Sequence, residues 1–368
     1  MKTTVLKDKI DALFPCTWNT DFKADVNQLL DKYVEIVKTS DEANHELLPF
    51  IKGLCNTISE TIECYYEGRR WLAFEKIYDS MNGTESSSGL IENLGRVTIM
   101  KEDFLYRGRV KENDKVFGIQ DLFHIPLDKR GLVKTQRFSS PGFPCLYLGN
   151  SIFCCWEELR RPSLENLYFS AFRSRRQFSL FDLRIPDIGD YQIDKIDQTL
   201  KRLPLILACN IVVRNSNDTF KPEYIIPQFI TDTIIMKNRA LLEDKSIMEN
   251  DMNIWGVIYS STQIHSDFTH GRKYLENIVL PIVEVNSKKK YCQYLASLFD
   301  ISIPSSYEYN ITNEQYEHST FALIEKELHN AEFEELEHMY IPDGVIYLDY
   351  LGNPVGVPTY ANTNWVVE

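Results

Sequence analysis

The chain has 368 residues, of which 43% are hydrophobic, 12% aromatic and 25% charged. This composition excludes a globally disordered chain, and the length predicts two folded units or one large unit with appended segments. The 40 Lys and Arg residues against 53 Asp and Glu leave a formal net charge of -13. An extended nucleic-acid surface is not expected, because the phosphate backbone would be repelled.

The sequence contains no apolar run of signal-peptide or membrane-span length, so we expect a cytoplasmic protein with no membrane association. Its eight cysteines form no C-x-x-C pair, and none has a histidine at zinc-site spacing, which predicts reduced thiols. The seven histidines include no H-E-x-x-H motif. A metal-dependent hydrolase therefore gains no support, and no metal site is predicted.

Helical periodicity dominates the first 81 residues. Apolar residues recur every three or four positions over 22–37, 47–65 and 74–81, which predicts three amphipathic helices. Asp21 or Thr20 is available as the N-cap of the first. The stretch 82–89 is rich in small polar residues and breaks the period. We therefore predict an all-α N-terminal domain over residues 1–95.

Short β-rich runs separated by Gly, Pro and Asn follow this boundary, at 104–107, 145–148 and 254–259. Helical patterns lie at 152–160 and 223–236, with an irregular insertion expected between them. The mixture predicts an α+β fold, with a mixed or antiparallel β core and flanking helices, and not a doubly wound parallel sheet. The predicted catalytic domain covers residues 96–285.

Residues 286–368 are expected to form a C-terminal extension that packs on the catalytic domain. The basic run 288–290 leads into it, and one strongly charged helix is predicted from Ala322 to Met339. The extension and the N-terminal helices are candidates for regulation, assembly or substrate exclusion. The apolar faces of the N-terminal helices fit internal packing and a homo-oligomer equally well.

Four polar clusters lie among the strand-like runs. They are Tyr106-Arg107-Gly108-Arg109, Arg137-Phe138-Ser139-Ser140-Pro141-Gly142, the helix bearing Glu157-Glu158, and Tyr259-Ser260-Ser261. Taken singly, each has an ordinary explanation, such as a surface ion pair or a turn. Their spacing is more specific, since Tyr147 follows Arg137 by ten residues and Glu158 follows Tyr147 by eleven.

In order, spacing and residue type, the clusters resemble the RES-domain family, which is named for its arginine, glutamate and serine. The resemblance covers roughly Phe104 to Pro281, about half the chain. It implies an ADP-ribosyltransferase-like fold and an NAD⁺ glycohydrolase or NAD⁺ phosphorylase, often a toxin held by an antitoxin. It also implies that Arg107, Glu158 and Ser261 are the catalytic residues.

The residue types suit NAD⁺, which is expected as the substrate, with no cofactor. The planar donor fork of arginine matches pyrophosphate oxygens, so Arg107 and Arg137 are predicted anchors. Cleavage of the ribose–nicotinamide bond develops oxocarbenium character, which a carboxylate such as Glu158 stabilises. Tyr147 and Tyr106 can present aromatic faces to nicotinamide or adenine.

Other assignments stay open in the sequence. Glu158 is favoured over Glu157 by its spacing, and neighbours on a helix differ by ~100° in direction, so one of the two should face the pocket. Ion pairing with the following arginines explains either glutamate as well. Arg109 is either a surface pair or a second phosphate contact, and Tyr106 and Arg107 should face opposite sides of their strand.

Further substrate contacts are predicted at Tyr259 and, by hydrogen bonding, at Ser261, although Ser261 sits beside Ser260 and Thr262 and any of the three could simply close a strand end. His124 lies between the first two clusters and is a further candidate pocket residue. Gly108 departs from the family's pattern, because shorter members carry a bulkier residue there. Part of the substrate wall is therefore expected to come from elsewhere.

The leading hypothesis is an NAD⁺-degrading enzyme that releases nicotinamide and acts as a toxin or defence effector. Water or inorganic phosphate would capture the ribosyl cation. A second hypothesis keeps the pocket but transfers ADP-ribose to a macromolecule, and a third makes the chain a nucleotide sensor without turnover. The expected partners are NAD⁺, inorganic phosphate, an antitoxin or regulatory protein, and a second copy of the chain.

Overall fold

The structure is a computed structural model that describes residues 3–84, 87–88, 95–111, 117–163, 166–186, 193–243, 253–262, 275–283 and 289–306, with short strands at 347–348, 354–355 and 360–361. The helix predicted from Ala322 to Met339 lies outside these residues. In the described part of the chain, no helix is both long enough and apolar enough to cross a membrane.

The three predicted N-terminal helices are present as α2 (Phe22–Thr39), α3 (Leu48–Tyr66) and α4 (Arg70–Asn82). The carboxylate of Asp21 caps α2 by accepting a 2.9 Å hydrogen bond from the amide of Ala24. An additional helix, α1 (Thr3–Asp11), precedes them, and a single 3₁₀ turn, η1 (His45–Leu47), opens α3. The periodic residues of α2 and α3 form the buried faces of these helices.

A large mixed sheet forms the rest of the described core and has the order β14-β10-β6-β4-β5-β9-β8-β7-β3, with β11 also paired to β6. Its strands are β3 (Arg96–Ile99), β4 (Phe104–Val110), β5 (Cys145–Gly149), β6 (Leu167–Ser174), β7 (Phe178–Leu183), β8 (Ile254–Ser260), β9 (Glu276–Pro281), β10 (Phe299–Ser302), β11 (Ser305–Ser306) and β14 (Tyr360–Ala361). Among the described strands, only β7 and β8 pair in parallel, and α7 (Ile193–Cys209) and α8 (Ile225–Glu243) lie between them in the chain. The predicted α+β class is confirmed.

The expectation of an irregular insertion after residue 160 is wrong. This stretch holds β6, β7 and α7. Strand β6 is almost completely buried on both faces, so it lacks the alternation that marks a half-buried strand. Helix α7 carries Pro204 in its interior, a residue that normally indicates a helix end.

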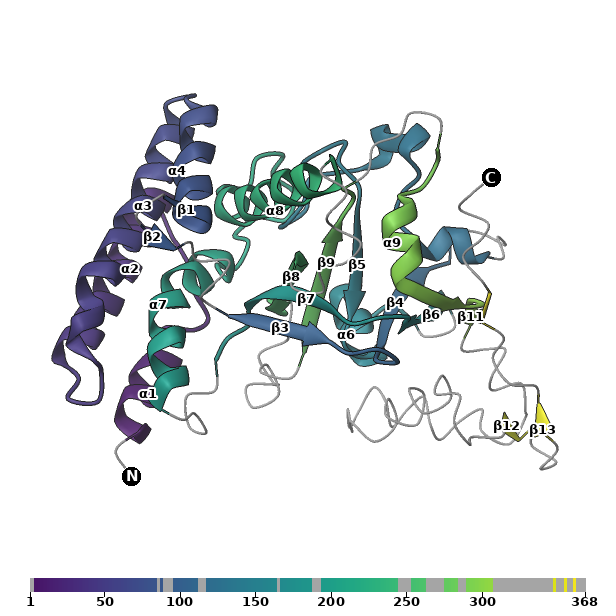
Figure 1. The fold of residues 1–368 in the computed structure, drawn as a ribbon, viewed down its shortest axis with the longest axis horizontal. Helices are drawn as coiled ribbons and strands as arrows, with labels where there is room; N and C mark the ends of the chain where they lie inside the picture. The colour runs from purple at the N-terminus through teal and green to yellow at the C-terminus, as the bar shows by residue number, and fades with distance from the viewer. Residues whose placement is uncertain are drawn as a thin grey trace.

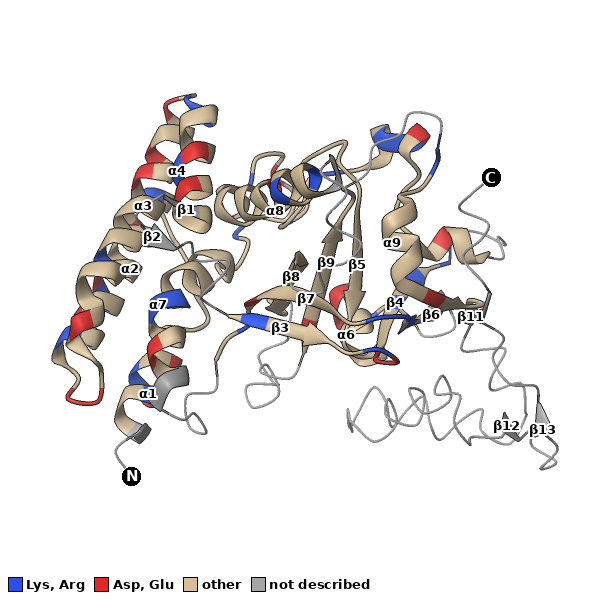
Figure 2. Ribbon diagram, in the orientation of Figure 1, with Lys and Arg blue, Asp and Glu red and all other residues tan. Residues whose placement is uncertain are grey.

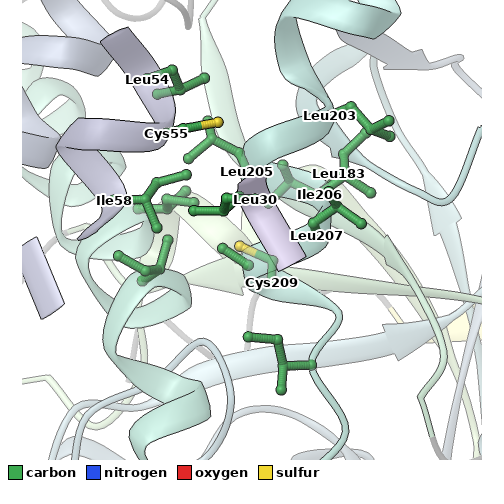
Figure 3. Packing of buried hydrophobic residues seen from close by; sticks show 14 of the residues in the cluster. Leu30, Leu54, Cys55, Ile58, Leu183, Leu203, Leu205, Ile206, Leu207 and Cys209 are labelled. Carbon is green, nitrogen blue, oxygen red and sulfur yellow. The ribbon is translucent and has the colours of Figure 1, made fainter. Parts of the chain in front are cut away.

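The N-terminal helices pack on α7 and α8, which separate them from the sheet (Figure 1). Figure 3 shows Leu30 and Ile58 of the N-terminal helices close to Ile206 and Cys209 of α7. All four belong to one hydrophobic cluster that also reaches the sheet through Val257. The boundary predicted near residue 95 stays a prediction, but the helices before it share their core with elements after it.

Charge is distributed unevenly over these layers. Figure 2 shows Lys and Arg together with Asp and Glu along α2, α3 and α4, whereas β8 is tan throughout. Every residue of β8 is buried. By contrast, no charged residue of α2, α3 or α4 is buried, as expected for helices with one apolar stripe.

Part of the predicted C-terminal extension belongs to the sheet. Helix α9 (Gln293–Leu298) leads directly into β10, and Phe299 of β10 pairs with Ser174 of β6. The ring of Tyr294 on α9 stacks on Trp255 of β8 with a 3.8 Å centroid separation. Residues 293–302 therefore cover and extend the sheet.

Candidate active site

The candidate site is built where β4 and β5 meet. These two strands pair at Tyr106 and Gly149, and α6 (Ile152–Glu158) follows β5 directly. A Cβ atom at Gly149 would lie 2.9 Å from Sγ of Cys155, so glycine is what lets α6 approach the strand this closely. The hydroxyl of Ser151 caps α6 by accepting a 3.0 Å hydrogen bond from the amide of Cys154.

Helix α6 ends at Glu158, which places this carboxylate at the tip of the helix. Arg160 and Arg161 adopt positive φ angles of 65° and 53°, a left-handed conformation that stops the helix. Glu157, one residue earlier, is 2% exposed and forms a 2.9 Å ion pair with Arg161. The two glutamates therefore point differently, as their ~100° helical separation requires.

Glu158 forms the centre of a hydrogen-bonded triad. Its Oε1 accepts a 2.5 Å hydrogen bond from the hydroxyl of Ser261, just beyond β8, and a second hydrogen bond from Nδ2 of Asn277 on β9. Burial raises the pKa of Glu158, while these two hydrogen bonds and the charge of Arg137 lower it. The net effect is a raised pKa on a carboxylate whose direction is fixed by two donors.

The positive charge of Arg137 acts on this triad, because it lowers the pKa of Glu158. Its side chain is buried, and its Nη2 donates a 3.1 Å hydrogen bond to Oγ1 of Thr262, the residue after Ser261. Its Nη1 donates to the carbonyl oxygens of Cys209 and Ile211, both at 2.9 Å. Backbone carbonyls therefore hold the guanidinium in place beside the Glu158 triad.

Three tyrosines line the same region. The guanidinium of Arg137 lies over the Tyr224 ring, 5.5 Å from its centroid. The hydroxyl of Tyr147 donates a 3.0 Å hydrogen bond to Oγ of Ser139. Tyr259 is buried against Phe138, and burial together with the charge of Glu158 raises its pKa well above the ordinary value. Tyr147 and Tyr259 are therefore neutral phenols.

The predicted residues of β4 divide between the two faces of the sheet. Tyr106 packs with α6 in one buried cluster, whereas Leu105 belongs to another on the opposite face. Strand alternation places Arg107 and Arg109 on the Leu105 side. Arg109 donates a 3.0 Å hydrogen bond to the carbonyl of Asp121, and its guanidinium lies 4.6 Å from the centroid of the ring of Phe117. The structure does not bring Arg109 to the Glu158 triad.

Arg107 lies with Arg109 on the Leu105 side of β4, and no contact between described residues joins it to the Glu158 triad. Its Nη1 is buried and has no hydrogen-bond partner in the described part of the chain. Burial, followed by the neighbouring charge of Arg109, lowers its pKa to about 10, and Tyr147 also contributes to its electrostatic environment. A buried guanidinium with an unpaired donor is costly unless an anion binds it.

The remaining sequence candidates are structural. His124 is fully buried; its Nδ1 lies 2.8 Å from the carbonyl oxygen of Ile125, and its Nε2 accepts a 2.9 Å hydrogen bond from the amide of Cys292. It joins the segment before η3 (Leu127–Leu132) to the start of α9. A Cβ atom at Gly108 would lie 3.1 Å from the side chains of Leu159 and Phe169, which fill the space that a bulkier residue would take.

Two contacts could not be assigned from the sequence. Nothing in the sequence shows that Asn277 contacts Glu158 or that Tyr224 contacts Arg137. Cys154 contributes as well, since its thiol lies 3.5 Å from Oδ1 of Asn277 and orients that amide. In the described part of the chain, no cluster of three or more His, Cys, Asp or Glu residues is arranged to hold a metal ion.

Comparison with known proteins identifies the family of this chain. The family model for the RES domain matches residues 115–281. A protein of Bacillus subtilis (strain 168), named "Putative toxin YopC", is 30% identical over 325 residues, which cover 82% of this chain and 69% of the relative. No solved structure matches the chain.

The chain belongs to the RES-domain family. The matched range contains Arg137, Tyr147, Glu158 and the Tyr259–Ser261 strand end, and it begins after Arg107. The predicted likeness to ADP-ribosyltransferases in fold stays a prediction.

Proposed function

We propose that this protein degrades NAD⁺ by cleaving the bond between ribose C1″ and the nicotinamide nitrogen. The observation that carries the proposal is the Glu158 carboxylate, which Ser261 and Asn277 hold by two hydrogen bonds to one oxygen. A carboxylate fixed in this way, partly shielded from water, stabilises positive charge on a ribosyl ring better than a solvated one does.

In the proposed reaction, the C1″–N bond breaks and its electron pair leaves with nicotinamide, which needs no proton to become neutral. The ribosyl ring becomes an oxocarbenium ion that Glu158 stabilises. Water or inorganic phosphate then attacks C1″, which gives ADP-ribose with release of one proton, or ADP-ribose 1″-phosphate. No enzyme nucleophile and no cofactor is required.

The arginines supply the anion-binding part of the proposal. The buried Nη1 of Arg107 has no hydrogen-bond partner among the described residues, and a pyrophosphate oxygen would satisfy it. Arg137 is held beside the Glu158 triad by carbonyl oxygens and adds positive charge there. Tyr259 provides aromatic surface next to the same carboxylate, and Tyr147 lies close to Tyr259.

The similarity to a protein named as a toxin supports a toxic or defensive role. We propose that the chain depletes cellular NAD⁺ and that a protein antitoxin restrains it. Induction of the wild-type chain without such a partner is expected to stop growth as NAD⁺ falls. Normal growth with unchanged NAD⁺ would contradict the proposed role.

Purified protein incubated with labelled NAD⁺, with and without inorganic phosphate, identifies the acceptor. Free ADP-ribose in both reactions indicates a glycohydrolase, and ADP-ribose 1″-phosphate that appears with phosphate indicates a phosphorylase. Label retained on macromolecules would point instead to ADP-ribosyl transfer. NAD⁺ left intact by partner-free protein would refute an NAD⁺-degrading activity and favour a sensor.

A further inference from the structure

The segment that joins α7 to α8, residues 209–224, holds Arg137. The carbonyl oxygens of Cys209 and Ile211 each accept a 2.9 Å hydrogen bond from Nη1 of Arg137. At the other end of the segment, the ring of Tyr224 in η6 (Pro222–Tyr224) lies beneath the guanidinium. The position of this segment therefore determines the position of Arg137.

The N-terminal part of the chain is hydrogen-bonded to the beginning of this segment. Cys16, in the loop between α1 and α2, forms a parallel β-bridge with Ile211. The carbonyl of Cys16 accepts a 2.8 Å hydrogen bond from the amide of Val212. The residue whose carbonyl binds Arg137 is thus itself held by the N-terminal loop.

A second attachment lies two residues further along the same loop. The indole Nε1 of Trp18 donates a 2.8 Å hydrogen bond to Oε1 of Glu223, the neighbour of Tyr224. The backbone amide of Arg214 donates a 2.9 Å hydrogen bond to the same oxygen. The guanidinium of Arg214 lies over the Trp18 ring. Glu223 is 2% exposed, so loss of the Trp18 donor would leave a buried carboxylate with one partner fewer.

A third attachment comes from the end of α3. Phe220 stacks on Tyr65 with a 5.8 Å centroid separation and meets the edge of Tyr66 at 6.0 Å. The segment 209–224 is therefore held near its start, near its middle and near its end by residues that precede α4. Figure 1 shows the corresponding adjacency of the N-terminal helices to α7 and α8.

We infer that the N-terminal helices are part of the active site's scaffold, and that Trp18 and Glu223 are positioning residues that act on the substrate through Arg137. This inference rests on the proposed function. It assigns to the N-terminal helices a role in substrate binding, in addition to any contact with a partner.

The test compares two variants of the full chain that each remove one hydrogen bond between the N-terminal helices and later elements. Trp18→Phe removes the bond to Glu223. Tyr33→Phe removes a 2.6 Å bond from the Tyr33 hydroxyl to the carbonyl of Leu200 on α7, outside the segment 209–224. Both should lower Tm, because each loses a tertiary hydrogen bond.

Only Trp18→Phe should change the kinetics of the enzyme. We expect its KM for NAD⁺ to rise roughly tenfold with a smaller effect on kcat, because a displaced Arg137 guanidinium binds the substrate less well. The acid limb of its pH profile should move to higher pH, because the charge of Arg137 lowers the pKa of Glu158. Glu223→Gln should stay close to wild type, since its amide oxygen can accept both hydrogen bonds.

Equal KM and equal pH profiles for Trp18→Phe and Tyr33→Phe would overturn the inference. If Trp18→Phe does not fold, Phe220→Ala replaces it, because Phe220 is 48% exposed and its truncation should be tolerated. An inactive wild-type chain would refute the proposed function alone. Positioning is then decided by hydrogen exchange, which should quicken over 209–224 in Trp18→Phe and not in Tyr33→Phe.

Discussion

The hydroxyl of Ser261 donates a 2.5 Å hydrogen bond to Oε1 of Glu158, although 103 residues separate the two in the chain. Strands β5, β9 and β8 are neighbours in the sheet, and this order brings the end of α6 to the end of β8. The serine and the glutamate of the RES pattern are therefore direct partners. The first prediction follows from this contact.

Ser261→Ala should make the enzyme more sensitive to acid. The Ser261 hydroxyl lowers the pKa of Glu158, so its removal raises that pKa further, and the acid limb of kcat/KM should move up by roughly one pH unit. Ser260→Ala is the matched control, because the Ser260 hydroxyl accepts from the amide of Ile185 and not from a site residue. An identical acid limb in Ser261→Ala and wild type would contradict the role of Ser261.

Glu158→Gln should stabilise the protein at neutral pH. Burial raises the folded-state pKa of Glu158 above its unfolded value, so the stabilisation belongs to the protonated form and is lost as pH rises through the folded pKa. Glutamine mimics the protonated form. Tm should therefore rise at pH 7, by roughly 2–4 °C for each kcal/mol gained, and the difference should shrink towards pH 4.

Glu157→Gln is the control for that measurement. Glu157 is paired with Arg161, so its neutralisation should lower Tm instead. A fall in Tm for both variants would show that burial of the ionised Glu158 carboxylate does not destabilise the protein.

Arg107→Met should separate stability from ligand binding. The variant removes a buried cation whose Nη1 has no partner among the described residues, so the ligand-free protein should melt at a higher temperature than wild type. ADP-ribose at about 100 times its Kd should stabilise wild type by about 2.7 kcal/mol. The same gain in stability for Arg107→Met at the same ADP-ribose concentration would rule out Arg107 as a phosphate anchor.

His124 predicts an acid-sensitive fold. Burial lowers the pKa of His124 from 6.5 to about 4, so the neutral imidazole contributes stability that is complete above pH 6.5 and is lost as pH falls towards 4. The loss should approach about 3 kcal/mol. Urea unfolding between pH 7 and pH 4 measures it. His124→Leu should be less stable at pH 7 but should show a flatter pH dependence.

The sequence predicted the helices that have one buried face and the short β-rich runs that end in polar residues. Helices α2, α3 and α4 have an apolar stripe with a helical period, and the ends of β4 and β8 carry polar residues next to apolar runs. The period disappears where both faces are buried, as in β6, and a proline inside α7 imitates a helix end. These elements could not be identified from local pattern.

The sequence predicted some of the residues that the structure brings together, but not their geometry. Spacing favoured Glu158 over Glu157, and in the structure Glu158 accepts a hydrogen bond from Ser261. The division of β4 between two faces follows from alternation, but the contact of Arg109 with Asp121 and of Asn277 with Glu158 depends on strand order. Strand order joins residues far apart in the chain, and no local signal encodes it.

The central claim is that Glu158 stabilises the ribosyl cation during NAD⁺ cleavage. Its most direct test is the rate of nicotinamide release from NAD⁺ by purified wild type, Glu158→Gln and Glu157→Gln at pH 7. We predict release by wild type, a loss of about 10²–10³-fold in kcat for Glu158→Gln, and near wild-type kcat for Glu157→Gln. Equal rates in Glu158→Gln and wild type, or loss in Glu157→Gln alone, would contradict the account.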